Sequence, residues 1–158
     1  MQTVVDINNS FKKIVDEHIQ LQKFYTHSID QMDIDKIDVN LFPFLYAQVT
    51  GMSIDAGVTV FTYEVTVADL VIEETEPVVT QVFGETALIM QDVIAAFSLN
   101  VNSVAVTLGL VPDTYGFTLP VSCDAFSARF DNSLTGWSCS FDIRVPNALN
   151  LCDALYTT

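Results

Sequence analysis

The chain has 158 residues, which is the size of one ordinary domain with a substantial core. Half of the residues are hydrophobic, only 16% are charged, and the mean hydropathy of +0.37 favours a domain that also buries surface against partners. The 20 acidic and 6 basic residues give a formal net charge of −14, which disfavours tight binding to nucleic acid or to an anionic membrane.

Targeting and redox signals are weak. No apolar run comes near the ~20 residues that span a bilayer, and the opening MQTVVDINNS lacks the basic and apolar regions of a signal peptide. Cys123, Cys139 and Cys152 form no C-x-x-C pair, so they predict neither a disulfide framework nor a zinc site. We therefore expect a protein that folds in a reducing cytosol, with Cys139 as a small core residue.

The first predicted element is an amphipathic helix over residues 9–28. Asn8, Asn9 and Ser10 offer N-cap oxygens. Apolar positions then recur at helical spacing, at Phe11, Ile14, Val15, His18, Leu21 and Tyr25. An acidic link, residues 30–38, follows this helix.

Residues 41–71 predict an antiparallel hairpin with one solvated face. The apolar run LFPFLYAQV forms its first strand, with Pro43 near the start, and TGMSIDAG reads as the turn. In the second strand, Phe61, Tyr63, Val65 and Val67 alternate with polar residues, so they share one face of the sheet.

A second helix is predicted over residues 77–98. Thr75 can cap it and Pro77 suits its first turn. Its apolar stripe comprises Val79, Val82, Phe83, Thr86, Met90, Val93, Ile94 and Phe97. Strands are then predicted within residues 102–146, at 103–109, 125–131 and 137–145, with a long exposed loop at 110–124.

The last strand alternates most cleanly. Its apolar residues, Trp137, Cys139, Phe141, Ile143 and Val145, predict a core-facing side, and Ser138, Ser140, Asp142 and Arg144 predict an outward side. With so many acidic residues, Arg144 is expected to pair with a carboxylate of this chain or of a neighbouring subunit. The element order predicts a single α+β domain over residues 1–158, with two helices packed on one face of a largely antiparallel sheet of about five strands.

Residues with catalytic or ligating chemistry are few. His18 and His27, both placed on the first helix, stand nine positions apart, which does not suit a helical metal pair. Asp30, Asp33, Asp35 and Asp38 faintly resemble a calcium loop, but they lack its turn glycine and its closing glutamate. The sequence therefore assigns no catalytic, cofactor-binding or metal-binding residue, and it predicts a protein that is not an enzyme.

Three segments, taken in order, resemble a known family. They are the hairpin LFPFLYAQVTG…VTVFTYEVTVADLVIEETEP, the helix VTQVFGETALIMQDVIAAF, and the terminal RFDNSLTGWSCSFDIRVPNALNLC. Together they cover most of residues 40–152 and are similar to tail-terminator-like or neck proteins, the head–tail connector proteins of tailed bacteriophages. The resemblance rests on pattern and order, and it carries no catalytic motif.

This resemblance implies a virion structural protein that forms a homo-oligomeric ring, a hexamer or a twelve-fold ring. The ring would be assembled in the host cytoplasm, would contact neighbouring tail, neck or portal proteins, and would let the genome pass through its lumen without binding DNA tightly or touching a membrane. Loop 110–124 and the acidic link 30–38 are expected to reach a neighbouring ring. The acidic charge would then keep DNA from adhering to the channel wall.

A different class of function also fits the sequence. A small non-catalytic binding module, for a carbohydrate or a peptide, would present aromatic residues such as Tyr115 and Phe117 at a loop tip. It would be monomeric or dimeric, so the oligomeric state separates it from a ring protein.

Overall fold

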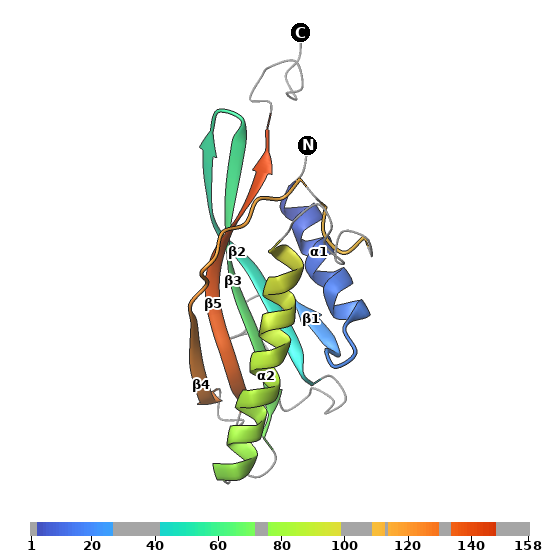
Figure 1. Ribbon diagram of the computed structural model, residues 1–158, viewed down its shortest axis with the longest axis vertical. Helices are drawn as coiled ribbons and strands as arrows, with labels where there is room; N and C mark the ends of the chain where they lie inside the picture. The colour runs from blue at the N-terminus through green and yellow to red at the C-terminus, as the bar shows by residue number, and fades with distance from the viewer. Residues whose placement is uncertain are drawn as a thin grey trace.

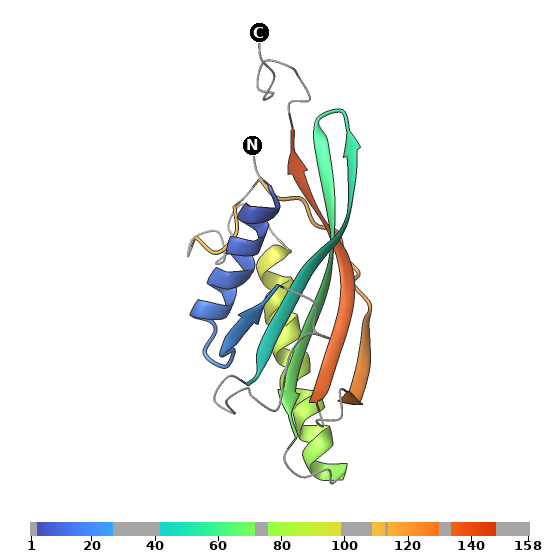
Figure 2. The ribbon, with the colours of Figure 1, turned by 180° about the vertical axis from the view of Figure 1, so that it is seen from behind.

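The computed structural model describes residues 3–26, 42–71, 76–98, 109–112, 114–129 and 134–147. The helices are α1 (Val4–Glu17) and α2 (Glu76–Phe97), and the strands are β1 (Lys23–Tyr25), β2 (Phe44–Asp55), β3 (Val58–Leu70), β4 (Cys123–Arg129) and β5 (Leu134–Pro146). Both helices cover the same face of one sheet (Figures 1 and 2). The described residues confirm the predicted α+β class, with two helices and a sheet of five strands, although β1 lies within the range predicted for the first helix.

The sheet is mixed, with the strand order β1-β2-β3-β5-β4. Strand β1 runs parallel to β2, whereas the β2–β3, β3–β5 and β4–β5 pairings are antiparallel. Strands β3 and β5 pair along their whole length, from Val58 opposite Pro146 to Leu70 opposite Leu134. This long central pair places four residues of each strand in the main core: Phe61, Tyr63, Val65 and Val67 of β3, and Cys139, Phe141, Ile143 and Val145 of β5.

Helix α1 begins and ends earlier than predicted. The backbone N–H of Thr3 donates to the Asp6 carboxylate at 2.8 Å, so the cap is Thr3 and not residues 8–10, which lie inside the helix. The helix ends at Glu17 because His18 has an extended backbone (φ −76°, ψ 131°). The prediction that this helix extends to residue 28 is wrong. Leu21 is buried in the turn that follows α1, and Tyr25 belongs to β1. His27 and the acidic link 30–38 lie outside the described residues.

The predicted hairpin is confirmed, but its turn is shorter than expected. Strand β2 continues to Asp55, and Ala56 and Gly57 form the turn, with Gly57 at φ 84°. A register shift between Val49 and Gly51 marks a bulge in β2. The stretch that reads as a loop from its glycine and polar residues is therefore mostly strand.

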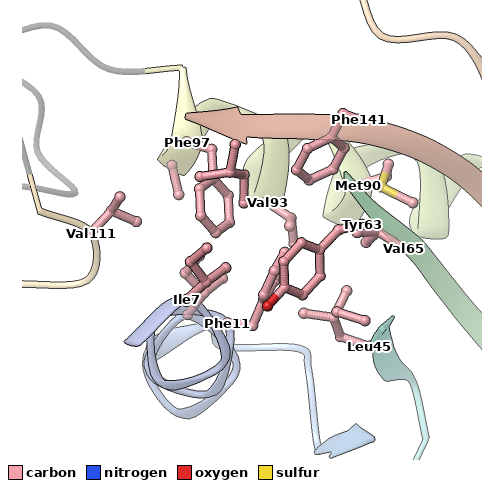
Figure 3. Close-up of a cluster of buried hydrophobic side chains, with 14 of the residues drawn as sticks. Ile7, Phe11, Leu45, Tyr63, Val65, Met90, Val93, Phe97, Val111 and Phe141 are labelled. Atoms are coloured by element: carbon pink, nitrogen blue, oxygen red, sulfur yellow. The ribbon is translucent and has the colours of Figure 1, made fainter. Parts of the chain in front are cut away.

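The main core lies between the helices and the sheet, as the alternation predicts. Phe11 of α1 stands with its ring centroid 5.3 Å from Tyr63 of β3 and 4.7 Å from Phe97 of α2 (Figure 3). Phe141 of β5 stands 6.0 Å from Phe97. Each large side chain buried here contributes about 1.5–3 kcal/mol of transfer free energy, so this aromatic cluster locks both helices to the sheet.

Helix α2 matches its predicted range, and its predicted stripe faces the sheet; Thr75 lies outside the described residues. Its stretch Pro77–Phe97 has 21 residues and a mean hydropathy of 1.2, sufficient by length and composition to cross a membrane. The expectation that no run comes near this length is therefore wrong for α2. Only 28% of its most apolar window is buried, and Leu88 is an exposed large apolar residue of this helix.

The segment predicted as an exposed loop packs instead against the body. Val111 and Tyr115 are buried, and the ring of Phe117 meets Phe141 edge-on at 5.1 Å. Gly116 exchanges two backbone hydrogen bonds with Arg144 of β5. The prediction of an exposed loop is thus wrong for this part, because its apolar side chains extend the core beyond the end of α2. Residues 101–108, with most of the predicted strand 103–109, lie outside the described residues.

Candidate interaction surface

A projecting arm, residues 51–58 at the tip of the β2–β3 hairpin, carries two exposed large apolar side chains, Met52 and Ile54. Its tip extends beyond both helices (Figures 1 and 2). Met52 is 60% exposed and Ile54 is 56% exposed. Met52 lies opposite Phe61 and Ile54 opposite Thr59, so both point to the side of the sheet that carries the helices. The arm therefore presents an apolar strip on the helix side, past the layer that would cover it.

An apolar groove runs between α2 and the edge strand β4, with a volume of about 500 Å³. Helix α2 lines it with Ala87, Met90, Gln91, Ile94 and Ala95, and the remaining lining residues are Ser98, Leu119, Val121, Cys123 and Trp137. None of these side chains carries a formal charge at neutral pH. Leu119 at its rim is 55% exposed. A groove of this size and composition suits an apolar side chain or a small apolar ligand.

Two edges of the sheet lack a neighbouring strand within the described residues. Strand β4 forms one side of the sheet. On the other side, β1 pairs only with Phe44–Tyr46, so the outer edge of β2 from residue 47 to residue 55 is unpaired there. Open edges present rows of backbone N–H and C=O groups that can pair with another chain.

A second hollow, of about 670 Å³, lies between residues 118–122 and the outward face of β5. It is polar and contains Glu64, Asp124, Asp142 and Arg144. Among the described residues, no carboxylate oxygen lies within 4.0 Å of the Arg144 guanidinium. The expected partner within the chain is therefore not found in the described part, and a neighbouring subunit remains the other source that the sequence suggested.

Carboxylates occur on both layers of the domain. Asp6, Asp16, Glu17, Glu85 and Asp92 lie on the helices, whereas Glu64, Asp124 and Asp142 line the polar hollow on the opposite face of the sheet. The arm carries Asp55 as its one charged residue, and the groove lining carries none. The arm and the groove are thus weakly charged surfaces on a strongly acidic chain.

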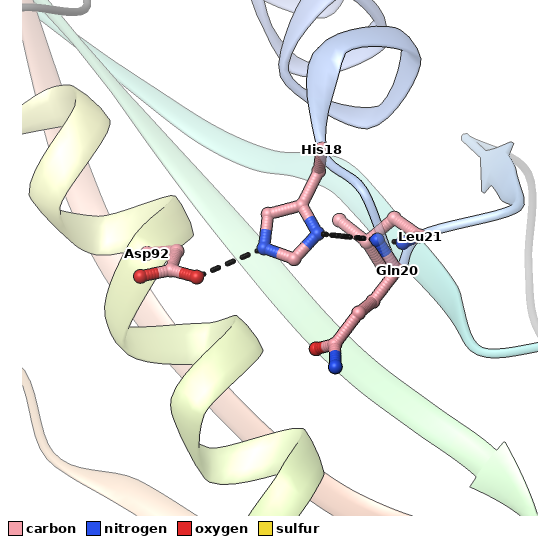
Figure 4. Close-up of polar contacts among 4 residues, drawn as sticks. All are labelled: His18, Gln20, Leu21 and Asp92. Carbon is pink, nitrogen blue, oxygen red and sulfur yellow. Dashed lines mark hydrogen bonds and ion pairs between the residues drawn. The ribbon is translucent and has the colours of Figure 1, made fainter.

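His18 and Asp92 form the pair of side chains that most resembles an acid–base pair, but their contacts join parts of the fold. The His18 Nε2 atom lies 2.9 Å from the Asp92 carboxylate, and Nδ1 accepts hydrogen bonds from the backbone N–H groups of Gln20 and Leu21 (Figure 4). Nε2 therefore carries the proton and donates a hydrogen bond to the Asp92 carboxylate. Because both ring nitrogens are engaged within the domain, His18 joins the end of α1 to α2.

Two other titratable groups, Cys139 and Asp69, have pKa values that are shifted by burial in the packed fold. Burial raises the pKa of the Cys139 thiol, which lies 3.9 Å from the Met90 sulfur in the core. Burial likewise raises the pKa of the Asp69 carboxyl, although that group accepts a hydrogen bond from the Leu70 N–H at 2.7 Å. Within the described residues, no group of three or more His, Cys, Asp or Glu side chains could hold a metal ion.

No protein-family model matches the sequence, and no curated protein matches it significantly.

Sequence reasoning missed both the arm and the groove. Met52 and Ile54 alternate with Gly51 and Ser53, a strand signal that lies within a stretch otherwise typical of a turn. The groove combines side chains of α2 with Leu119 and Val121 from a segment read as an exposed loop, so only the tertiary fold brings them together.

Proposed function

We propose that this chain is a structural protein of a tailed bacteriophage virion. It would form a ring at the neck or tail end, join the tail to the connector of the capsid, and let the genome pass through its lumen. The observation that carries the proposal is the pair of weakly charged apolar surfaces, the arm and the groove, on a domain of net charge −14. Such surfaces mark sites of protein association.

The two surfaces differ in shape and lie on different elements, which favours a ring over a symmetric dimer. A contact between two different patches is heterologous, and repeated contacts of this kind close into a ring when the rotation between copies permits it. The tail-terminator-like resemblance suggests six or twelve copies. The three antiparallel pairings among the described strands agree with the largely antiparallel sheet of that fold.

The helix-free face of the sheet is the face we assign to the lumen. Glu64, Asp124 and Asp142 line the polar hollow there, together with the hydroxyl groups of Ser138 and Ser140. A wall with more carboxylates than cations repels DNA phosphates and so lets the duplex slide. Carboxylates also lie on the helices, which would form the outer surface and contact neighbouring tail, neck or portal proteins within the virion.

The alternative is a small non-catalytic binding module. From the sequence it depended on Tyr115 and Phe117 as exposed aromatic residues, and both pack against the body of the domain. The groove beside α2 is the surface that would serve such a module, because its volume of about 500 Å³ is that of small-ligand sites. In that case the groove would hold a free apolar ligand, and the protein would stay monomeric or dimeric.

Native mass spectrometry of the purified chain tests the ring directly. Spectra at several protein concentrations, in low and high salt, should show closed assemblies of six or twelve copies. High salt should favour assembly, because screening weakens the repulsion between acidic copies. A monomer or dimer under every condition, combined with absence of the chain from purified virions, would refute the proposal.

A further inference from the structure

The arm and the groove can be assigned to one another. We propose that the arm of one copy, residues 51–58, pairs edge to edge with β4 of the next copy and inserts Met52 and Ile54 into that copy's α2–β4 groove. This inference rests on the proposed ring, since it names the contact that would build it. The occupant of the groove is thus a second copy of this chain.

The backbone supports the pairing because each copy supplies one open edge of each kind. Within the described part of the chain, the outer edge of β2 is unpaired beyond β1, and β4 is the strand at the opposite side of the sheet. Strands β2 and β5 run in the same direction, whereas β4 runs opposite to both, as the three antiparallel pairings require. If neighbouring sheets share one orientation, β2 of one copy therefore meets β4 of the next copy in an antiparallel pairing, which extends the sheet.

The side chains match on the same side of the sheet. Met52 and Ile54 point to the helix side, because their partners in β3 are Phe61 and Thr59. The groove also opens on the helix side, since α2 forms one of its walls. In a continuous sheet whose helices all lie outside, the apolar strip of the arm would therefore face the apolar groove of the neighbour. A pairing in the opposite orientation would instead bring it to the polar hollow.

Electrostatics favours this contact over others between copies. Two chains of net charge −14 repel one another, so the contact between them should use surfaces with few carboxylates. The arm carries only Asp55, and the groove lining carries no charged residue.

The arm and β4 lie at different heights along the strands. Residues 51–55 of β2 align through β3 with residues 142–146 of β5, whereas β4 pairs with β5 only at residues 134–139. Pairing them requires each copy to be displaced along the strand direction relative to its neighbour. Such a displacement is the stagger of strands that are tilted with respect to the axis of a closed sheet.

Cross-linking through a native cysteine tests the contact at the level of single residues. Cys123 lines the groove and is half-buried, and Cys139 is buried in the core. In a Cys152→Ser background, Ile54→Cys should be joined to Cys123 of the next copy by a short bismaleimide. Ile19→Cys is the matched control, because Ile19 is 92% exposed and belongs to neither surface. Adding Cys123→Ser to Ile54→Cys should abolish the product.

Charge insertion provides an independent readout. Met52→Asp combined with Ile54→Asp should raise the concentration needed for half-assembly about 100-fold or more, since buried apolar anchors at interfaces dominate affinity. Ile19→Asp should leave it within about 2-fold. Because all three side chains are more than half exposed in the single chain, circular dichroism should show unchanged folding.

The outcomes separate this contact from the ring itself. One result would overturn the contact but not the ring. The wild type and the Met52→Asp/Ile54→Asp variant would both form rings, and the Ile54→Cys variant would give no cross-link to Cys123. A wild type that stays monomeric, together with an Ile54→Cys variant that gives no cross-link, would overturn both. Cross-linked chains that depend on Cys123 support the contact, and their closure at six or twelve copies, as opposed to open chains, supports the ring.

Discussion

Trp137 of β5 donates its indole N–H to the backbone carbonyl oxygen of Phe83 in α2 at a distance of 3.0 Å. The two rings also meet edge-on, with their centroids 5.7 Å apart. The only tryptophan of the chain thus ties α2 to the sheet and forms part of the groove wall. Its orientation is fixed by a polar contact at one end and an aromatic contact along its side.

Replacing Trp137 by Phe should lower the free energy of unfolding by about 1–2 kcal/mol. The change removes a hydrogen bond, which contributes about 1 kcal/mol, and leaves a gap beside Phe83. Urea unfolding followed by circular dichroism measures the difference. Ser140→Ala, at an exposed position of the same strand, should change stability by less than about 0.5 kcal/mol. Equal effects of the two changes would contradict the structural role of Trp137.

Gly136 and Gly84 have opposite surroundings, so replacing each by alanine should have opposite effects on stability. A Cβ atom at Gly136 would lie 2.0 Å from the carbonyl oxygen of Val67 in the central strand pair, whereas a Cβ atom at Gly84 in α2 meets nothing within 4 Å. Gly136→Ala should therefore destabilise the fold by about 3 kcal/mol or more, because backbone must move. Gly84→Ala should stabilise it by about 0.5–1 kcal/mol, since alanine favours helix. Thermal unfolding of both variants, with the wild type, gives the comparison.

The sequence predicts the elements whose apolar residues keep one period. Alternation in β3 and β5, and helical spacing in α2, indicate the correct faces because each element packs one face against the other layer. The α1 boundaries are wrong because Leu21 and Tyr25 continue the helical spacing by coincidence, in a turn and in β1. The local signal for the true start was the pair Thr3 and Asp6, which form the capping box.

The candidate surfaces were less predictable because they depend on which residues lack a covering layer. Met52 and Ile54 are apolar residue types that also occur in the core. They are exposed because the hairpin extends beyond the helices. Similarly, Tyr115 and Phe117 read as loop residues, yet Tyr115 is buried in the core and Phe117 packs beside Phe97 and Phe141. Non-local packing of this kind leaves no periodic mark in the sequence.

Replacing the Asp69 carboxyl by a neutral amide should raise the stability of the protein by an amount that depends on pH. Burial raises its folded pKa above the ordinary value of 3.8, so its ionised form is disfavoured in the folded state. The wild type therefore loses stability from this group as the pH rises through the folded pKa. Asp69→Asn should be more stable than the wild type at neutral pH, and the difference should shrink below pH 3.8. An amide oxygen can still accept the Leu70 N–H.

Urea unfolding at a series of pH values measures this difference. Asp16→Asn removes the same charge at an exposed site of α1 and controls for the change in net charge. An Asp69→Asn variant that is less stable than the wild type at neutral pH would show that the hydrogen bond to Leu70 outweighs the cost of burial.

Trp137 also provides an intrinsic reporter of the groove. Because its half-buried indole lines the groove and no other tryptophan is present, occupation of the groove should exclude water from the ring and shift its fluorescence emission to shorter wavelength. The shift should appear in the concentration range in which native mass spectrometry detects assembly. It should be absent at the same concentrations in the Met52→Asp/Ile54→Asp variant and retained in Ile19→Asp. Assembly without any change in emission would mean that copies associate through surfaces other than the groove.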